Sequence, residues 1–313
     1  MTGGAGFIGS HLLRRLVAAG FEVHVVHRPG SDLHRIADLS GSLRLWPCDL
    51  LDLDRLRTVL ESARPQAIYH LAGDASLSLR HFDSALSGVT ESIERNIRAS
   101  VNLFVAAATA HLPDLALLIR LGSSEEYGRG PLPYEETQRE LPVSPYSASQ
   151  VAVSHYLQML APRLDFRVLT IRAATIYGPG QSTQFLIASL IEHCLEGRDF
   201  PLGSSTHFRE FAYISDLIDA LVIALQKPVQ TGEIINIGTG HEHVIGDVAA
   251  LIIRLSGAQI KLVPGTPARA GQVEHLWLAT DKAQRLWGWK SKVNLETGLQ
   301  RMIQWCRERR GIE

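Results

Sequence analysis

The feature that most constrains the fold is an alternation of short β-rich runs with longer helical patterns. The apolar, β-rich runs are Phe21–His27, Leu43–Trp46, Ala67–Leu71, Leu115–Leu121 and Phe166–Ile171. Helical spacing of apolar residues is found over Phe7–Ala19, Ser84–His111 and Tyr146–Leu160. Leu115–Leu121 (LALLIRL) is almost continuously apolar, which is typical of a strand buried on both faces of a sheet. The alternation predicts an α/β fold with a Rossmann-like, doubly wound parallel sheet.

A glycine-rich segment, TGGAGFIG, opens the first helical pattern. Gly3 permits a tight turn, Gly6 lets the backbone approach a pyrophosphate, and Gly9 lets the helix lie close to the sheet. The N–H groups of the first helical turn, at Phe7 and Ile8, can bind phosphate oxygens. Because a strand follows the helix, we interpret the segment as a dinucleotide-binding loop rather than as an ordinary Gly-rich turn.

Residues at the ends of the following strands are expected to contact the rest of the dinucleotide. An acid after the second strand suits the ribose 2′-hydroxyl of NAD, and a base suits the 2′-phosphate of NADP. The chain has Arg28 and no acid there, which favours NADP over NAD unless Arg28 is a solvated surface residue. Asp49, followed by Leu50, could bind an adenine edge or cap a helix. Leu71 and Ala72 end a later strand and are expected to line the same site.

The first strand of such a sheet should precede the glycine-rich loop, but the loop begins at Thr2. Loss of a central strand leaves backbone groups of its neighbours unpaired, which is costly where they are buried. We therefore expect the natural chain to start upstream of this numbering.

Two parts of the chain differ in pattern. We expect residues 1–175 to form the NAD(P)-binding domain, with later strands at about residues 205–240 returning to its sheet. After about residue 175 loop signals such as GPGQ and GTGHEH separate shorter elements. Residues 176–313 should form mainly a smaller C-terminal lobe that binds substrate.

Charge and cysteine content exclude several classes of function. The net charge is −1, so no basic field favours nucleic acid or an anionic membrane. The three cysteines are far apart, and neither CxxC nor a Cys/His cluster is present, which indicates no metal site and a reducing, cytoplasmic location. No stretch approaches the roughly 20 apolar residues of a membrane span.

Further segments occur in the order found in a known family. They are TGGAGFIGSHL, CDLLD, YHLAG, GSSEEYG, SPYSAS, IYGPGQ, REFAYISDLIDAL, EIINIGTG and DKAQRLWGW. With them the chain resembles, nearly end to end, the extended short-chain dehydrogenase/reductase family of NAD(P)-dependent nucleotide-sugar epimerases and dehydratases. The resemblance implies a nucleotide-sugar substrate, bound NADP or NAD, and a homodimer formed through the two long helices.

In that family a Ser or Thr, a Tyr and a Lys carry out the acid–base chemistry. The resemblance assigns these roles to Ser123 and Tyr146, but Gln150 stands at the lysine position. Gln can hydrogen-bond to ribose hydroxyls, but it cannot lower the pKa of a tyrosine, which is near 10 when free. We expect Tyr146 to be a weak base near neutral pH that can still donate a proton during a reduction. A slow enzyme, a reductase-like enzyme and a binding protein without turnover remain open.

The segment after Ser123 bears on the type of reaction. Ser123, Ser124 and Glu125 match the Thr-Ser-Glu of GDP-mannose 4,6-dehydratases, whose Glu takes the C5 proton. The whole string SSEEYG is more similar to GDP-4-keto-6-deoxy-mannose reductases. The resemblance therefore implies a dehydratase or a 4-ketoreductase, with a 4-epimerase as the alternative. Glu125 could also be a surface residue at a strand end, and Glu126 is expected to be a solvated neighbour.

The resemblance also assigns substrate contacts. Asn96 matches an Asn that orders the active-site helix, and Thr175 stands where the family usually has Asn. Arg209 and Arg269 match arginines that bind the diphosphate, for which the bidentate guanidinium is well suited. A salt bridge is the alternative role for each arginine.

Overall fold

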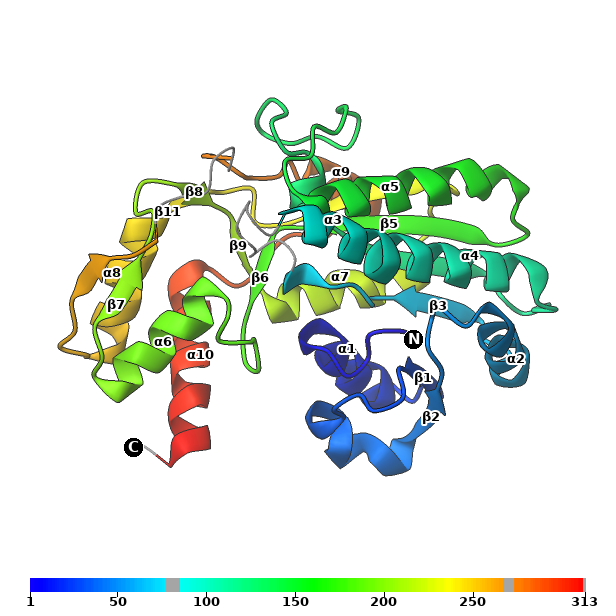
Figure 1. The fold of residues 1–313 in the computed structure, drawn as a ribbon, viewed down its shortest axis with the longest axis horizontal. Helices are drawn as coiled ribbons and strands as arrows, with labels where there is room; N and C mark the ends of the chain where they lie inside the picture. The colour runs from blue at the N-terminus through cyan, green and yellow to red at the C-terminus, as the bar shows by residue number, and fades with distance from the viewer. Residues whose placement is uncertain (77–84, 267–272, 312–313) are drawn as a thin grey trace.

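The computed structural model describes residues 1–76, 85–266 and 273–311 (Figure 1). Its helices are α1 Phe7–Ala18, α2 Leu53–Ala63, α3 Ala85–Ser92, α4 Ala99–Thr109, α5 Pro145–Leu160, α6 Leu186–Glu196, α7 Ile214–Gln226, α8 Ile245–Ser256, α9 Asp281–Trp287 and α10 Leu295–Arg310. Its strands are β1 Val23–His27, β2 Leu43–Pro47, β3 Ala67–His70, β4 Leu117–Ser123, β5 Arg167–Ala173, β6 Thr175–Tyr177, β7 Phe200–Leu202, β8 Phe208–Arg209, β9 Phe211–Tyr213, β10 Glu233–Ile237, β11 His243–Val244 and β12 Leu262–Pro264. The predicted alternation of strands and helices is confirmed.

The central sheet is parallel and has a helix layer on each face. Strand β1 pairs with β2, and β3, β4, β5 and β10 follow one another in the order β3-β4-β5-β10. Side chains alternate between two cores: Ile119 packs with α1 and α7, whereas Leu118 packs with α2, α4 and α5. This two-sided packing is the doubly wound arrangement that the apolar run of β4 predicts.

Met1 and Thr2 occupy the position between β1 and β3. Thr2 bridges Val26 on one side and His70 on the other, both in parallel. The N–H of Thr2 donates to Tyr69 O at 2.9 Å, and the N–H of Val26 donates to Met1 O at 2.9 Å. The two halves of the sheet are therefore joined through these residues, and the glycine-rich loop begins directly after them. A start upstream of this numbering stays a prediction.

Most elements after β6 form a second, smaller lobe beside the sheet, whereas α7 packs against α1 and α9 packs against β10 (Figure 1). Strand β8 pairs with β11 and β7 pairs with β12, while α6, α8 and α10 pack together. The parallel pair β6–β9 lies between this lobe and the sheet, and β10 returns to the sheet beside β5. The predicted division near residue 175 and the role of the lobe in substrate binding stay predictions.

The predicted helix Ser84–His111 is interrupted in the structure. Residues Ile93–Arg98 form a π-helix between α3 and α4, a rare local widening that is frequent at functional sites. Ser84 lies outside the described residues. Of the helices in the described part of the chain, none is long and apolar enough to cross a membrane.

Candidate active site

The glycine-rich loop is packed so closely that side chains are excluded. Gly3 has φ = 72°, and a Cβ on it would lie 2.6 Å from the main chain of Leu71 and Ala72. A Cβ on Gly9 would lie 2.1 Å from Gly3 O. Helix α1 begins at the next turn with Gly6 as N-cap and no side-chain cap. The N–H groups of Phe7 and Ile8 at its start can therefore be approached by phosphate oxygens, and the loop fits the pyrophosphate of a dinucleotide.

The other predicted cofactor residues lie at neighbouring strand ends. Arg28 follows β1 and is exposed. Asp49 follows β2, and its carboxylate accepts the N–H of Leu51 at 3.0 Å, which makes a local turn. Asp52, not Asp49, caps α2. Leu50 O accepts the side-chain amide of Asn102 at 2.9 Å, so this loop is tied to α4.

Ser123 and Tyr146 meet where β4 ends and α5 begins. Ser144 caps α5 by accepting the N–H of Ser147 at 3.0 Å, and Pro145 occupies the first helical position, so Tyr146 lies in the first turn. Ser123 Oγ accepts the N–H of Glu125 at 3.1 Å. The structure thus brings together the hydroxyl groups that the sequence predicts to act together.

The phenol of Tyr146 is a poor base in this setting. Removal from water raises the pKa of Tyr146 above its ordinary value, and the carboxylates of Glu125 and Glu126 raise it further. The Arg120 guanidinium and a hydrogen bond with Ser123 act in the opposite direction but do not cancel the rise. Tyr146 is therefore a neutral phenol across the physiological range, suited to donating a proton.

Gln150 is buried and contacts an arginine that the sequence analysis did not single out. Arg120 Nη2 donates to Gln150 Oε1 at 2.6 Å and to the main-chain oxygen of Gln150 at 2.9 Å. The Gln150 Nε2 atom faces away from Arg120, since it lies 3.8 Å from where a Cβ on Gly73 would be. Gly73 follows β3, so this amide lies beside the loop that adjoins Gly3.

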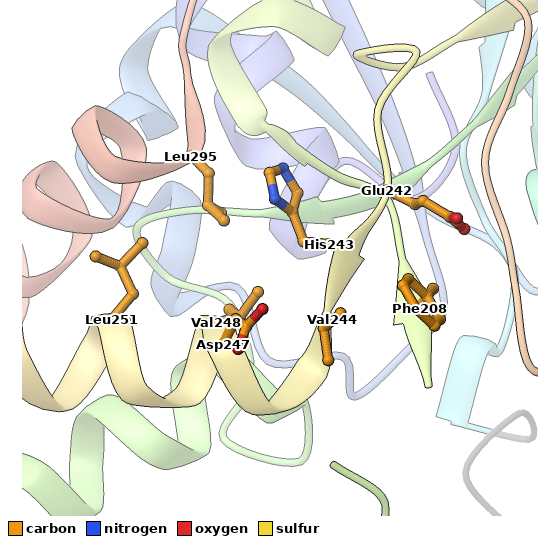
Figure 2. Close-up of a pocket in the computed structure, with 8 residues that line it drawn as sticks. All are labelled: Phe208, Glu242, His243, Val244, Asp247, Val248, Leu251 and Leu295. Atoms are coloured by element: carbon orange, nitrogen blue, oxygen red, sulfur yellow. The ribbon is translucent and has the colours of Figure 1, made fainter. Parts of the chain in front are cut away.

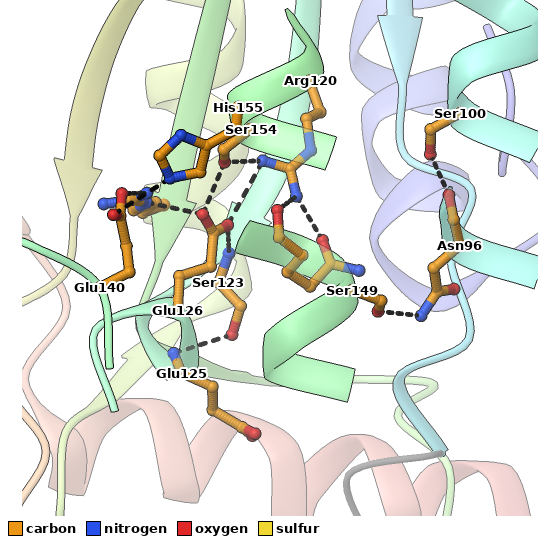
Figure 3. Close-up of polar contacts among 12 residues, drawn as sticks. Asn96, Ser100, Arg120, Ser123, Glu125, Glu126, Glu140, Ser149, Ser154 and His155 are labelled. Atoms are coloured by element: carbon orange, nitrogen blue, oxygen red, sulfur yellow. Dashed lines mark hydrogen bonds and ion pairs between the residues drawn. The ribbon is translucent and has the colours of Figure 1, made fainter. Parts of the chain in front are cut away.

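Glu126 is not solvated, and that prediction is wrong. Its side chain is fully buried, and it forms ion pairs with Arg120 (Oε1–Nη1, 3.3 Å) and Arg172 (Oε2–Nε, 2.9 Å). Arg172 also pairs with Glu140 at 2.6 Å, and Ser154 on α5 bridges Arg120 and Glu126 (Figure 3). Buried charges are costly unless they are paired, and each arginine and glutamate of this cluster has an ionic partner.

Glu125 lies in the turn that directly follows β4. The sequence places it one residue before the buried Glu126, in the 3₁₀ turn Ser124–Glu126. Its carboxylate raises the pKa of Tyr146 and opposes the lowering of the Arg209 pKa that burial causes. Glu125 therefore lies close enough to act electrostatically on the phenol at the sheet and on an arginine of the lobe. The preceding Ser124 is buried.

Asn96 connects the π-helix to the catalytic helix. Its Oδ1 accepts the N–H of Asp74 at 2.8 Å, and its Nδ2 donates to Ser149 Oγ at 2.9 Å. Ser149 in turn donates to the main-chain oxygen of Tyr146 at 2.7 Å. Asn96 is buried and is linked through Ser149 to the first turn of α5; its role in ordering an active site stays a prediction.

Of the other predicted substrate residues, the structure describes Arg209 and Thr175. The Arg209 guanidinium donates to the carbonyls of Phe208, Val273 and Glu274 at 2.6–3.0 Å, so carbonyl oxygens rather than a carboxylate hold it at the lobe. Thr175 begins β6 and is half-buried. Arg269 lies outside the described residues.

A separate cavity of about 370 Å³ lies in the smaller lobe. Figure 2 shows its lining residues: Phe208, Glu242, His243, Val244, Asp247, Val248, Leu251 and Leu295. It contains none of the predicted catalytic residues, and we assign it no role. In the described residues no group of three or more His, Cys, Asp or Glu side chains could hold a metal ion.

Comparison with known proteins identifies the family. A model of the NAD dependent epimerase/dehydratase family matches residues 1–238. The chain belongs to this family. A UDP-glucose 4-epimerase of Mycolicibacterium smegmatis is 30% identical over 99% of this chain and 98% of that protein. Relatives of this kind do not support the GDP-sugar specificity that the SSEEYG string favours.

Solved structures agree with the epimerase/dehydratase family. The UDP-glucose 4-epimerase of Thermotoga maritima with UDP-glucose superposes with a TM-score of 0.89 at 26% identity, covering 98% of each chain. A dTDP-glucose 4,6-dehydratase of Streptomyces venezuelae with bound NAD has a TM-score of 0.87 at 27% identity, covering 99% of this chain and 97% of that chain. These likenesses confirm the Rossmann-like fold, and they give no support to an NADP preference.

Two residues of the site escaped the sequence analysis. Arg120 and Arg172 lie on β4 and β5 with side chains that are 1% and 0% exposed. A signal was present, because an arginine inside LALLIRL, a run predicted to be buried on both faces, requires a buried partner. The identity of that partner could not be read from sequence spacing, since Glu126, Gln150 and Ser154 come from a turn and a helix.

Proposed function

We propose that the chain is an NAD-dependent nucleotide-sugar 4,6-dehydratase. The observation that carries the proposal is the position of Glu125, whose carboxylate acts on both the Tyr146 phenol and the Arg209 guanidinium. A 4-epimerase needs no carboxylate beside its Ser and Tyr, whereas a dehydratase needs a base for a second carbon. The diphosphate of the substrate would bind near Arg209 and Arg269.

The proposed cofactor is NAD. The tight loop at Gly3 and Gly9 fits a pyrophosphate, and Asp49 and Leu50 lie at the next strand end for the adenosine half. Arg28, which favours NADP in the sequence, is exposed and is proposed to be a surface residue. When bound, NAD accepts a hydride from the sugar and returns it.

Tyr146 and Ser123 act at the sugar C4. The ionised form of Tyr146 would accept the proton of the C4 hydroxyl at Oη, and Ser123 Oγ would hold the same oxygen. The raised pKa of Tyr146 makes this proton removal slow. Gln150 contributes a hydrogen bond toward the cofactor ribose, and Asn96 fixes the first turn of α5 through Ser149.

Glu125 acts at C5 and C6. With C4 oxidised, the C5 proton is acidic, and the Glu125 carboxylate removes it. The proton then passes to the C6 hydroxyl, which leaves as water, and the backbone of Ser124 positions Glu125 at the start of the 3₁₀ turn. Return of the hydride at C6 and uptake of a solvent proton at C5 would complete a 4-keto-6-deoxy sugar, and the proton held by Tyr146 would return to solvent.

The test is mass spectrometry of UDP-, dTDP-, GDP- and CDP-hexoses incubated with the protein and NAD in D₂O. The proposal predicts loss of one water with one deuterium gained at C5 for at least one of them. Glu125→Gln should abolish water loss, because the amide cannot accept the proton, while NAD affinity should be retained. Unchanged sugars with tight binding of both ligands would instead identify a binding protein without turnover.

A 4-ketoreductase is the second candidate, favoured by the neutral phenol of Tyr146, which is ready to donate a proton to a carbonyl oxygen. It would consume NADH or NADPH in the presence of a nucleotide 4-keto-6-deoxyhexose and leave hexoses unchanged. Stoichiometric loss of absorbance at the nicotinamide band would distinguish it from a dehydratase, in which the cofactor is regenerated.

A 4-epimerase is the third candidate, favoured by the similarity to the 4-epimerase of Mycolicibacterium smegmatis. It would interconvert the two C4 epimers without change in mass and without uptake of deuterium. Chromatographic separation of the epimers after the same incubation detects it.

We also propose a homodimer. Exposed apolar side chains gather on the helices that the resemblance assigns to the interface: Val89 on α3, Ile93 on the π-helix, and Tyr156 and Met159 on α5, each 43–50% exposed. Alanines such as Ala106 and Ala107 are buried within the chain instead. Light scattering should give a dimer mass for the wild type, and Met159→Glu should give a monomer.

A further inference from the structure

We infer that Arg120 and Gln150 together replace the lysine that follows the catalytic tyrosine in related enzymes. Arg120 supplies the positive charge, and Gln150 supplies the hydrogen-bond donor that faces the cofactor. The inference rests on the proposed function, because it concerns the same tyrosine. Arg120 is here a positioning residue, since it acts through Gln150 and through its field.

The orientation of the Gln150 amide follows from its neighbour. A guanidinium has five N–H donors and no acceptor, so the atom 2.6 Å from Arg120 Nη2 must be the amide oxygen. The Nε2 group consequently points the other way, toward Gly73 and the side chain of Asn96. Among the described residues, Gln150 Nε2 has no hydrogen-bond partner in the structure. A donor held in a fixed direction beside the β3 loop is what a ribose hydroxyl requires.

Arg120 reaches the site from the sheet instead of from the helix. It lies on the face of β4 that packs against α5, as Leu118 does, so its side chain extends under the first turns of that helix. It contacts Gln150 and Ser154, one helical turn apart. A lysine at residue 150 would approach Tyr146 along α5, which carries both residues. Arg120 instead brings a cation to the same helical turn from β4.

Arg120 has no carboxylate partner of its own among the described residues. Glu126 is shared between Arg120 and Arg172, and the shorter of the two contacts is to Arg172. Arg120 is also the cation that lowers the pKa of Tyr146 against the effects of Glu125 and Glu126. The same arginine therefore opposes the rise in the Tyr146 pKa and orients the amide.

The decisive experiment is a double-mutant cycle of Arg120→Met and Gln150→Lys. NAD affinity is measured by calorimetry and stability by thermal unfolding. Arg120→Met should weaken NAD binding about tenfold, because the charge-assisted hydrogen bond that orients the amide is lost. Gln150→Lys alone should lower the melting temperature, because it sets a second cation beside Arg120. In the Arg120→Met background the same Gln150→Lys change should raise both NAD affinity and stability.

The sign reversal is the prediction, and additive effects would overturn it. Gln150→Lys that improves NAD binding equally in both backgrounds would show that Arg120 supplies no charge to the site. Arg120→Met that lowers stability but leaves NAD affinity unchanged would make Arg120 a purely structural ion pair. If Arg120→Met does not fold, Gln150→Met and Gln150→Lys are compared with the wild type instead. Both variants should bind NAD more weakly than the wild type, and Gln150→Lys should bind it no more tightly than Gln150→Met.

Turnover, where a substrate is found, adds a second readout. Arg120 lowers the pKa of Tyr146, so its removal should move the ascending limb of the kcat profile, where the tyrosinate base forms, to higher pH. Arg120→Lys should restore most of the wild-type pH profile. If Arg120 has only a structural role, the pH profile of Arg120→Met should match that of the wild type and only the yield of folded protein should fall. Failure of every sugar to react would sink the proposed dehydratase, but the NAD-binding cycle would still decide the role of Arg120.

Discussion

The glycine-rich loop and the region of Tyr146 with its buried charge cluster (Arg120, Glu126 and Arg172), called here the tyrosine corner, are built in opposite ways. The loop uses the absence of side chains: Gly3 and Gly9 allow main chain to lie against main chain at distances that a Cβ would prevent. The tyrosine corner uses side chains buried against one another, with Arg120, Glu126 and Arg172 paired under Tyr146.

The difference determines what each region tolerates. A backbone site is fixed by a few consecutive residues, and a single added methyl group disrupts it. A buried charge cluster depends on residues from β4, β5, a turn and α5, and removal of one member leaves another charge unpaired. The tyrosine corner can therefore accept a glutamine in place of a lysine if another residue supplies the positive charge. The glycine-rich loop cannot be compensated in this way, because it depends on the absence of side chains.

The largest effect is expected in the charge cluster. Arg172→Met should lower the free energy of unfolding by about 3–5 kcal/mol, because Glu126 loses its shorter ion pair in a dry environment. Arg254→Met is the matched control. The Arg254–Glu296 pair is exposed, and its loss should cost at most about 1 kcal/mol. Equal losses in urea unfolding of the two variants would contradict the role assigned to the cluster.

A methyl group in the loop should follow in size. Gly9→Ala places a Cβ against Gly3 O, and relief of the clash should cost about 1–3 kcal/mol of stability and most of the NAD affinity. Gly41→Ala serves as the control, because nothing lies within 4 Å of its Cβ position. Calorimetric NAD binding by Gly9→Ala at the level of the control would show that the loop is not a tight cradle.

Acid should destabilise the region where the loop and the corner adjoin. His70, buried between Thr2 Oγ1 (2.7 Å) and Ser100 Oγ (2.8 Å), has its pKa lowered to about 3, mainly by burial. The unfolded chain takes up a proton on this ring near pH 6.5, and the folded chain does not. Stability should therefore fall from pH 6.5 toward pH 3 by up to about 1.4 kcal/mol per pH unit.

The His70→Gln variant isolates that contribution. It should be less stable at pH 7 but should lose less stability on acidification than the wild type. His111→Gln, at an exposed ring, should keep the wild-type slope in urea unfolding measured across the same range. Parallel curves for wild type and His70→Gln would assign the acid sensitivity to other groups.

The smallest effect is expected at the rim of the cofactor site. Arg28→Ala should change NAD affinity by less than about twofold, because an exposed arginine without a bound phosphate partner contributes little. Titration with NADP is the useful contrast. A large loss of NADP affinity, together with tighter binding of NADP than NAD by the wild type, would restore the NADP preference read from the sequence.

Much of the fold could be predicted because it depends on local pattern. The alternating runs indicated the strands β1 to β5 within a few residues and the helices α1, α4 and α5. The π-helix around Asn96 could not be predicted, because its cause is the tertiary hydrogen bonding of Asn96 to Asp74 and Ser149. The link that Thr2 makes between the two halves of the sheet could not be predicted either, because Met1 and Thr2 are too few residues to show the alternating pattern of a strand.

The candidate site could be predicted only where a motif carries it. The glycines were found by their spacing, and Ser123 and Tyr146 were assigned by the resemblance to the family. Glu126 was misjudged because a glutamate in a turn is usually solvated, and only the fold shows that Arg120 and Arg172 project toward it. From the sequence, Gln150 therefore indicates only the loss of a lysine, whereas the structure places the guanidinium of Arg120, which lies on β4, against Gln150.

The position of the C4 hydrogen in the product tests the account most directly. UDP-glucose and dTDP-glucose carrying deuterium at C4 are incubated with the protein and NAD, and the products are examined by NMR. A 4,6-dehydratase should give deuterium in the C6 methyl group of a 4-keto-6-deoxy product, because elimination at Glu125 would precede the return of hydride. Deuterium found at C4 of the epimerised hexose would contradict it and identify a 4-epimerase.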